Sequence, residues 1–289
     1  MPALNAEIRS AEGKVGLTLR AGVVGAGGGM GGWFTRHLRG LGYEVEAVDT
    51  RDGSLEPVGA LDLVVVSVPI STTPAAVHEV ASHMRGSAVL AEIASLKGGS
   101  HPALVEASRL GVTPLCVHPM FGPSTGSLNG RVVAVVPVAD PEGERRQAEL
   151  LFPGADLITL DVGRHDRCMA VVLSLPYALN LALARVLTGE DLALSSRMAG
   201  STFSLQYILA QSIAGESPAL IRDLLRENAS LEPLLGAFVD SLEELLTASG
   251  DEDAFNSLHA EVVEALSRDP SYPGADARRQ MAHRAIAGA

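Results

Sequence analysis

Hydrophobic and polar positions follow two different patterns along the chain. Up to about residue 160, short apolar runs alternate with stretches of helical spacing, which predicts strands that alternate with helices. The runs that predict strands lie at 21–24, 43–48, 61–69, 88–93, 113–117 and 131–136. The stretches that predict helices lie at 33–41, 74–84, 102–110 and 141–151. This alternation is typical of an α/β protein with an open, mostly parallel, doubly wound sheet.

From residue 164 onward the pattern is helical, and no strand is predicted. Helical patterns cover 165–187, 192–214, 218–226, 231–249 and 251–266. The helix over 231–249 carries an apolar stripe that is too broad for a helix lying alone on a surface. We therefore expect a homodimer that shares these helices. The stretch from Pro270 onward, rich in Pro, Gly, Ala and Arg, is interpreted as a tail.

Composition narrows the class of protein. A chain of 289 residues with 47% hydrophobic residues is long enough for two domains with a sizeable core. The net charge of −12 argues against nucleic acid or an anionic membrane as a partner. Cys116 and Cys168 are interpreted as buried free thiols in a reducing compartment. We find no signal-peptide pattern and no apolar run of the ~18 residues that a membrane span needs, so we expect a soluble, cytoplasmic protein.

A glycine-dense turn joins the first predicted strand to the first predicted helix. Its residues are Gly25, Gly27, Gly28, Gly29, Met30 and Gly31. The spacing is a variant of Gly-x-Gly-x-x-Gly with one extra residue in the turn. Glycines allow the backbone to approach a pyrophosphate, and the following helix N-terminus favours its negative charge. The turn therefore predicts a dinucleotide site, although glycine-rich turns that bind nothing are also common.

The second predicted strand ends at Asp49, where a carboxylate can accept hydrogen bonds from both hydroxyls of an adenosine ribose. This position favours NAD, while Arg51 leaves NADP open as the minority interpretation because it could pair with a 2′-phosphate. Ser67, Val68 and Pro69 at the end of the 61–69 strand are further candidates for contact with the cofactor. We predict an N-terminal tail at 1–18, a dinucleotide-binding domain at 19–162 and a helical dimerisation and substrate domain at 163–289.

Candidate catalytic groups follow the later strands, where ligands of doubly wound sheets bind. His118 ends one predicted strand and can serve as a general base near neutral pH, although a structural role in the loop is the alternative. Ser95 is the natural partner to orient it. Lys97 supplies a cation for a substrate carboxylate, with a solvated loop lysine as the alternative.

At these residues the chain resembles the prephenate and arogenate dehydrogenases of tyrosine biosynthesis. The resemblance rests on four motifs, Val24–Phe34, Glu92–Lys97, His118–Pro123 and His165–Ala170, in an order and spacing that cover about 20–220. It implies a nucleotide-binding domain, a helical dimerisation domain and oxidative decarboxylation of a cyclohexadienol with NAD(P). It also implies that His118 accepts the proton of the ring 4-hydroxyl, that Ser95 holds the histidine and the hydroxyl, and that hydride passes from C4 to the nicotinamide.

The chain departs from this family at two positions. Tyr177 stands where many members carry a histidine, and Ser212 stands near the place of an arginine that grips the ring carboxylate. The substrate-binding candidates are therefore Lys97, Ser124, Tyr177 and Arg222, with Arg197 and Arg226 as further arginines. Two alternatives stay open, a 4-amino-4-deoxyprephenate dehydrogenase of an antibiotic pathway and a catalytically silent nucleotide-sensing homologue. No metal site is predicted.

Overall fold

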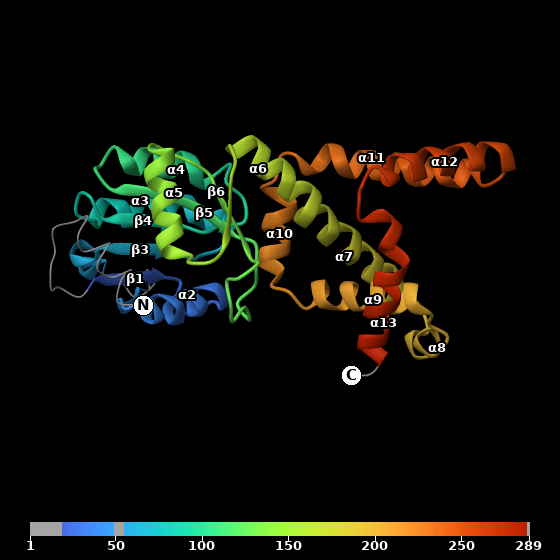
Figure 1. The fold of residues 1–289 in the computed structure, drawn as a ribbon, viewed down its shortest axis with the longest axis horizontal. Helices are drawn as coiled ribbons and strands as arrows, with labels where there is room; N and C mark the ends of the chain where they lie inside the picture. Colours follow the sequence, from blue (N-terminus) through green and yellow to red (C-terminus); the bar gives the residue numbers. More distant parts are fainter. Residues whose placement is uncertain (1–18, 49–54, 288–289) are drawn as a thin grey trace. The chain divides into compact units, whose positions relative to one another are not determined.

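The computed structural model describes residues 19–48 and 55–287, which divide into two compact units (Figure 1). Unit 1 runs to Met169 and includes the later segment Arg222–Asn228, whereas unit 2 contains Ala170–Ile221 and Ala229–Ala289. The first unit therefore extends past the predicted boundary at residue 162. The cofactor candidates Asp49 and Arg51 and the predicted tail at 1–18 lie outside the described residues.

Unit 1 is built on a seven-stranded sheet with the order β2-β1-β3-β4-β5-β6-β7. Its strands are β1 Arg20–Val24, β2 Glu44–Val48, β3 Leu63–Val66, β4 Val89–Glu92, β5 Thr113–Pro119, β6 Val132–Val135 and β7 Asp156–Thr159. Neighbouring strands are parallel except for the antiparallel pair β5 and β6. The predicted sheet is confirmed, but strand β7 was not predicted. It is a mostly exposed edge strand, so its sequence lacks the apolar run that marks the buried ones.

Helices cover both faces of this sheet. They are α2 Gly29–Gly40, α3 Thr73–His83, α4 Ser100–Ser108, α5 Pro141–Leu151 and α6 Val162–Met169, with short 3₁₀ turns η1 Glu56–Ala60 and η2 Ile70–Thr72. Helices α2 and α5 bury Phe34 and Leu151 against one face, while α3 and α4 bury Val77 and Leu104 against the other. The carboxyl ends of the parallel strands are therefore left open between two helical layers, as a doubly wound fold requires.

Unit 2 is helical in its described residues. Its elements are the π-helical turn η3 Ala170–Ser174, α7 Leu175–Leu187, α8 Leu192–Arg197, α9 Ser201–Ala214, the first part of α10 Pro218–Arg226, α11 Leu231–Ala248, α12 Glu252–Ser267, η4 Tyr272–Gly274 and α13 Ala275–Ala287. The single helix predicted over 192–214 is wrong, because the chain breaks before α9 at the extended residue Gly200. The tail predicted from Pro270 is also wrong. Helix α13 packs on α9, where Arg279 donates a hydrogen bond to the Ser201 hydroxyl at 2.6 Å.

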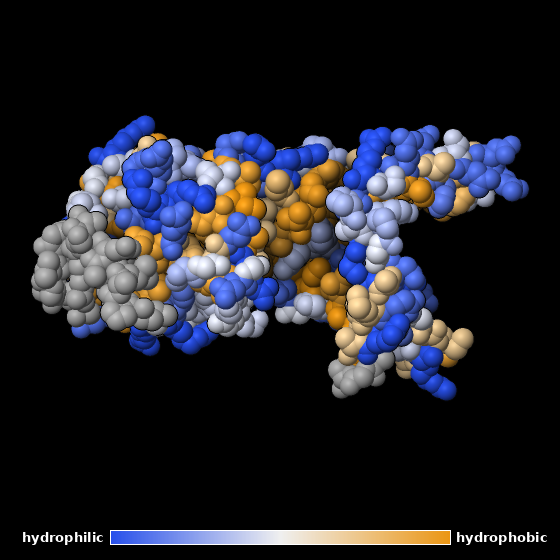
Figure 2. All heavy atoms as spheres, viewed as in Figure 1, coloured by the Kyte–Doolittle hydropathy of each residue, from blue (hydrophilic) through white to orange (hydrophobic). Residues whose placement is uncertain are grey.

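The helical run Val162–Leu187 is continuous through the π turn that precedes Pro176. Proline cannot donate the backbone hydrogen bond of an α-helix, which gives the change of helical bonding a local cause. By length and composition alone this run could cross a membrane, contrary to the expectation that no run is long enough. Val171 and Val172 are exposed, and Figure 2 shows hydrophobic residues at the surface over the start of α7. Exposed apolar surface of this kind is typical of interaction sites.

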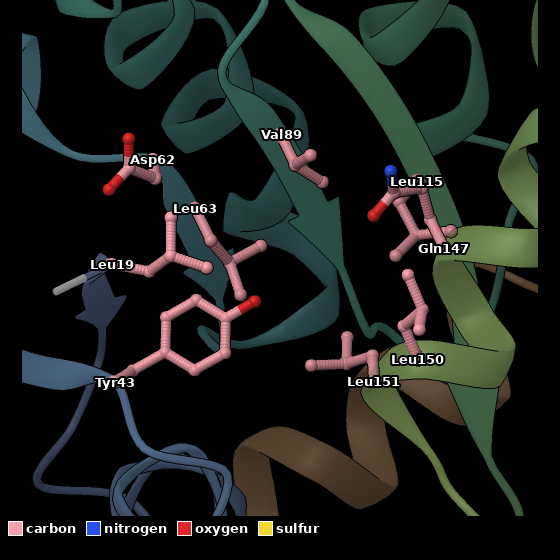
Figure 3. Close-up of a pocket in the computed structure, with 9 residues that line it drawn as sticks. All are labelled: Leu19, Tyr43, Asp62, Leu63, Val89, Leu115, Gln147, Leu150 and Leu151. Atoms are coloured by element: carbon pink, nitrogen blue, oxygen red, sulfur yellow. The ribbon is translucent and has the colours of Figure 1, made fainter. Parts of the chain in front are cut away.

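A small cavity of about 20 Å³ lies at the amino ends of the strands (Figure 3). Leu19, Asp62 and Val89 line it, just before or at the starts of β1, β3 and β4. This edge is opposite to the one at which β1 enters the glycine turn and β5 delivers His118. Ligands of doubly wound sheets bind at the carboxyl ends of strands, so we place the candidate site at that other edge.

Candidate active site

The glycine turn after β1 is closed by two glycines at its ends. Gly25 has a φ of +81°, and a Cβ there would lie 2.2 Å from the carbonyl oxygen of Ser67. A Cβ at Gly31 would lie 2.1 Å from the carbonyl oxygen of Gly25. Neither position can therefore hold a side chain without a shift of the backbone. The close approach of Gly31 to the carbonyl oxygen of Gly25, six positions earlier, explains why the variant spacing keeps a glycine at both positions.

The middle of the same turn is open. A Cβ at Gly27 would meet no atom within 4 Å. Gly28 is the N-cap of α2 and makes no side-chain capping bond, and the first turn of the helix has no acidic residue. The backbone N–H groups at this helix end can therefore receive an anion, and the turn fits the pyrophosphate of a dinucleotide.

The other described cofactor candidates surround this turn. Ser67 continues β3 and donates its backbone N–H to Val24 at 2.9 Å. A Cγ of Val68 lies 3.2 Å from the Cβ position of Gly25. Pro69 follows directly, and Met30 in the first turn of α2 packs against the core. The structure thus brings residues 67–69 and the glycine turn together at one edge of the sheet.

His118 lies near the end of β5 and is only 6% exposed. Its Nδ1 lies 3.2 Å from Nε2 of His165, a residue of α6. Ser95 is half-buried, and its side chain makes no hydrogen bond with any residue of the described chain. The predicted orientation of His118 by Ser95 is therefore replaced by orientation through His165. The sequence showed the His-Asp motif but not the fold that carries it to β5.

A carboxylate completes the chain of imidazoles. His165 is fully buried, and its Nδ1 lies 2.8 Å from Oδ1 of Asp166. Asp166 also accepts the backbone N–H groups of Lys97 at 2.9 Å and Gly98 at 2.8 Å. Burial raises the pKa of Asp166, but the hydrogen bonds from His165 and these backbone groups outweigh it, so the net pKa is lowered.

The ionised carboxylate sets the tautomers of both histidines. Asp166 can only accept, so we assign the Nδ1 hydrogen to His165, which leaves its Nε2 as an acceptor. His118 then donates from Nδ1, and its own Nε2 carries a free lone pair. Burial, followed by the charges of Lys97 and His165, lowers the pKa of His118 well below its ordinary value. The imidazole is thus neutral at neutral pH, the state in which it can accept a proton.

Lys97 is placed differently from the prediction. Its side chain is fully buried, and Nζ donates to Oε1 of Glu92 at 2.6 Å and to the carbonyl oxygen of Val117 at 2.7 Å. An ammonium enclosed in this way cannot contact a substrate carboxylate. The predicted substrate contact of Lys97 is therefore wrong, and its side chain binds Glu92 and Val117 inside unit 1. Sequence reasoning missed Glu92, although a carboxylate in an otherwise apolar strand signals a buried cation nearby.

Of the remaining substrate candidates, Ser124 and Arg222 belong to unit 1, and neither contacts His118 there. Ser124 is exposed and lines an open hollow of about 490 Å³ beside α2. The Arg222 side chain is 65% exposed and pairs with Asp223 at 3.2 Å. Tyr177 lies on α7 in unit 2, where burial, followed by the charge of Glu216, raises its pKa.

The segment Arg222–Asn228 carries contacts that the sequence did not predict. Asp223 is buried and accepts hydrogen bonds from the backbone N–H of Ser71 at 3.0 Å and from its hydroxyl at 2.8 Å. Asn228 donates to the carbonyl oxygen of Asp166 at 3.0 Å. This short segment of the helical half is therefore tied both to the loop after β3 and to the carboxylate behind His165.

Two further expectations concern metals and thiols. Within residues 19–48 and 55–287, no group of three or more His, Cys, Asp or Glu side chains could hold a metal ion. Both cysteines are free, as predicted. Cys116 is buried, but the expectation that Cys168 is buried is wrong, because it lies exposed on α6.

Comparison with known proteins agrees with this architecture. The nucleotide-binding domain of prephenate dehydrogenase, as a family model, matches residues 37–150, and the dimerization domain of the same family matches residues 161–262. Solved structures with the same fold include the Synechocystis arogenate dehydrogenase, with a TM-score of 0.66, 20% identity and coverage of 88% of this chain and 100% of that one. The prephenate dehydrogenase of Aquifex aeolicus, in complex with hydroxyphenyl propionate and NAD+, has a TM-score of 0.68, 20% identity and coverage of 89% and 100%.

Relatives in sequence carry related names. The probable arogenate/prephenate dehydrogenase of Methanocaldococcus jannaschii is 27% identical over 90% of this chain, which spans 62% of that protein's length. The 4-amino-4-deoxyprephenate dehydrogenase of Streptomyces pristinaespiralis is 34% identical, over 76% of this chain and 77% of the relative. Since the two family models together match most of the sequence, the chain belongs to the prephenate dehydrogenase family.

Proposed function

We propose that this chain catalyses the NAD-dependent oxidative decarboxylation of prephenate or arogenate, which yields 4-hydroxyphenylpyruvate or tyrosine. The observation that carries the proposal is the chain His118–His165–Asp166, which ends in a neutral imidazole at the edge of the sheet where the glycine turn lies. A base and a dinucleotide site at one edge suit the removal of a proton from the hydroxyl oxygen and a hydride from the carbon of one carbinol group.

The proposed cofactor is NAD. The open turn at Gly27 and the uncapped start of α2 support a bound pyrophosphate. The Aquifex aeolicus relative in fold has been solved with NAD+, which supports the same cofactor here. When bound, the nicotinamide accepts the hydride from ring carbon C4. We propose that Asp49 selects NAD over NADP, since a carboxylate accepts ribose hydroxyls and repels a 2′-phosphate.

The residues of the chain handle the proton. We propose that Nε2 of His118 takes the proton of the ring 4-hydroxyl as C4 is oxidised, and that the bond to the ring carboxylate then breaks with loss of CO₂. The electron pair of that bond makes the ring aromatic, and His118 returns the proton to the phenolic oxygen. His165 accepts from the Nδ1 hydrogen of His118 and so keeps its Nε2 free for the substrate proton, while Asp166 keeps His165 in the accepting tautomer.

The test is a panel of substrates with both cofactors, followed by the absorbance of the reduced nicotinamide. We expect turnover of prephenate or arogenate, with kcat/KM for NAD at least ~10-fold above that for NADP, about 1.4 kcal/mol of discrimination. Comparable values for the two cofactors would contradict the role of Asp49 and direct attention to Arg51.

The same panel decides between the alternatives. Turnover confined to 4-amino-4-deoxyprephenate would assign the chain to the activity named for the Streptomyces pristinaespiralis relative. NAD binding without turnover of any of the three compounds would instead identify a silent nucleotide-sensing protein.

We also propose a homodimer formed by unit 2, in a soluble, cytoplasmic enzyme. The family model assigns residues 161–262 to dimerization, and Phe238, Leu242 and Leu246 are exposed on α11.

Light scattering at micromolar protein should give a dimer mass. Leu242→Glu should weaken the dimer by at least ~10-fold, because a charge in an apolar interface loses its hydration. Glu243→Gln, an exposed change on the same helix, should not. A monomeric wild type would contradict the proposal.

A further inference from the structure

A fully buried ion pair lies directly behind His118. Glu92 is the last residue of β4, and both its side chain and that of Lys97 are 0% exposed. Oε1 of Glu92 accepts from Lys97 Nζ at 2.6 Å and from the Cys116 thiol at 2.9 Å, while Oε2 accepts from the backbone N–H of Ala94 at 2.9 Å. Glu92 and Cys116 are directly paired across β4 and β5. Oε1 of the carboxylate thus contacts both Lys97 and the strand that carries His118.

Lys97 connects this pair to both ends of the histidine chain. Its Nζ donates to the carbonyl oxygen of Val117, which belongs to the peptide group that leads into His118. Its backbone N–H donates to the Asp166 oxygen that also holds His165. One residue therefore contacts the backbone of the base at one end and the anchoring carboxylate at the other.

Burying an ion pair of this kind costs hydration free energy. Two charges that are removed from water lose more hydration free energy than an ordinary contact returns, and apolar residues of similar volume are often at least as stabilising. The three hydrogen bonds of Glu92 and the two of Lys97 Nζ offset part of this loss, but they give no stability that apolar packing would lack. The position behind His118 suggests a reason in the chemistry.

We propose that Glu92 and Lys97 are positioning residues for His118, and that their ion pair fixes the peptide between Val117 and His118 and holds a buried cation beside the imidazole. The inference rests on the proposed role of His118 as the base. The charged and titratable groups that face His118 are Lys97 and His165, with Glu92 behind the first and Asp166 behind the second.

The expected signature is a change in the titration of His118. Burial is the largest cause that lowers its pKa, and the Lys97 cation is the second, because it opposes a positive imidazolium. Without the cation, the imidazole should protonate at a higher pH. The acid limb of kcat/KM should then move to higher pH, while the dissociation constant for NAD should stay within about twofold, since the glycine turn follows a different strand.

The decisive variant is the double replacement Glu92→Met with Lys97→Met. Each single replacement leaves an unpaired buried charge and is expected to unfold readily, whereas the double replacement removes both charges at similar volume and should keep the fold. We expect kcat to fall by at least ~10-fold, with the acid limb shifted upward. NMR titration of the His118 imidazole in the folded variant gives the same pKa shift without any substrate.

Glu144→Gln is the matched control. Glu144 is a buried carboxylate that accepts backbone N–H groups of residues 138–140, so its loss should reduce stability without moving the acid limb. A folded double variant with wild-type kcat and an unchanged His118 titration would overturn the positioning role. A wild type that turns over no substrate would instead overturn the proposed function, and the NMR titration would still decide whether the pair acts on His118.

Discussion

Replacing His118 with asparagine is expected to lower kcat by ~10²–10⁴ while NAD binding stays nearly intact. Asparagine can retain a hydrogen bond to His165 but has no lone pair of suitable basicity, so the barrier should rise by roughly 3–5 kcal/mol. Steady-state kinetics on the best substrate of the panel and fluorescence titration with NAD measure the two effects separately.

The activity of the wild type should fall toward acid pH if His118 is the base. The pKa of His118 is lowered, first by burial and then by Lys97 and His165, so the base stays neutral through its ordinary pKa. Activity should therefore be flat down to about pH 6.5 and fall only below it, as the imidazole protonates. Folding stability should follow the same direction. The unfolded chain binds the proton more readily, so stability is full above its ordinary pKa and decreases as pH falls toward the folded value.

Ser95→Ala is the matched control for His118→Asn. Since Ser95 makes no hydrogen bond within the described chain, its loss should cost less than that of the base. His165→Gln should act on the same step as His118→Asn, and the double variant should be less than additive. Near-wild-type kcat in His118→Asn would make His118 a structural residue, and the base would have to be sought at His165 or Tyr177.

The glycine turn gives the second large effect. Gly31→Ala should destabilise unit 1 by about 1–3 kcal/mol or more and abolish measurable NAD binding, because its Cβ would lie 2.1 Å from a backbone oxygen. Gly25→Ala should behave similarly, since it also forces a side chain into a positive φ of +81°. Thermal unfolding with and without NAD measures both consequences.

Gly27→Ala separates binding from folding. A Cβ at this position meets no atom of the protein within 4 Å, so stability should change by no more than about 0.5 kcal/mol. If the pyrophosphate lies over this glycine, the added methyl should weaken NAD by roughly 10–100-fold, which corresponds to about 1.4–2.8 kcal/mol. A Gly27→Ala variant with wild-type affinity would place the pyrophosphate elsewhere.

The sequence by itself determined the doubly wound sheet, the division into an α/β half and a helical half, and the family. Continuous apolar runs and helical spacing reflect the local burial of each segment, so the runs at 61–69 and 88–93 predict strands without knowledge of their neighbours. The glycine turn is also legible locally, because its glycines are contiguous in the sequence and the Gly31 position is closed by the carbonyl oxygen of Gly25, six positions earlier. The four motifs that carry the family resemblance were therefore legible before the fold.

Only the tertiary structure decided what the side chains at the site touch. His118 meets His165 across 47 positions of sequence, and Lys97 turns inward to Glu92 and Val117 rather than outward to a substrate. Edge strand β7 and helix α13 were not predicted because most of their residues are exposed. Their sequences therefore lack the apolar pattern that marks a buried strand or helix. Partner choice depends on which strand ends and helices the fold brings together, and no local periodicity encodes it.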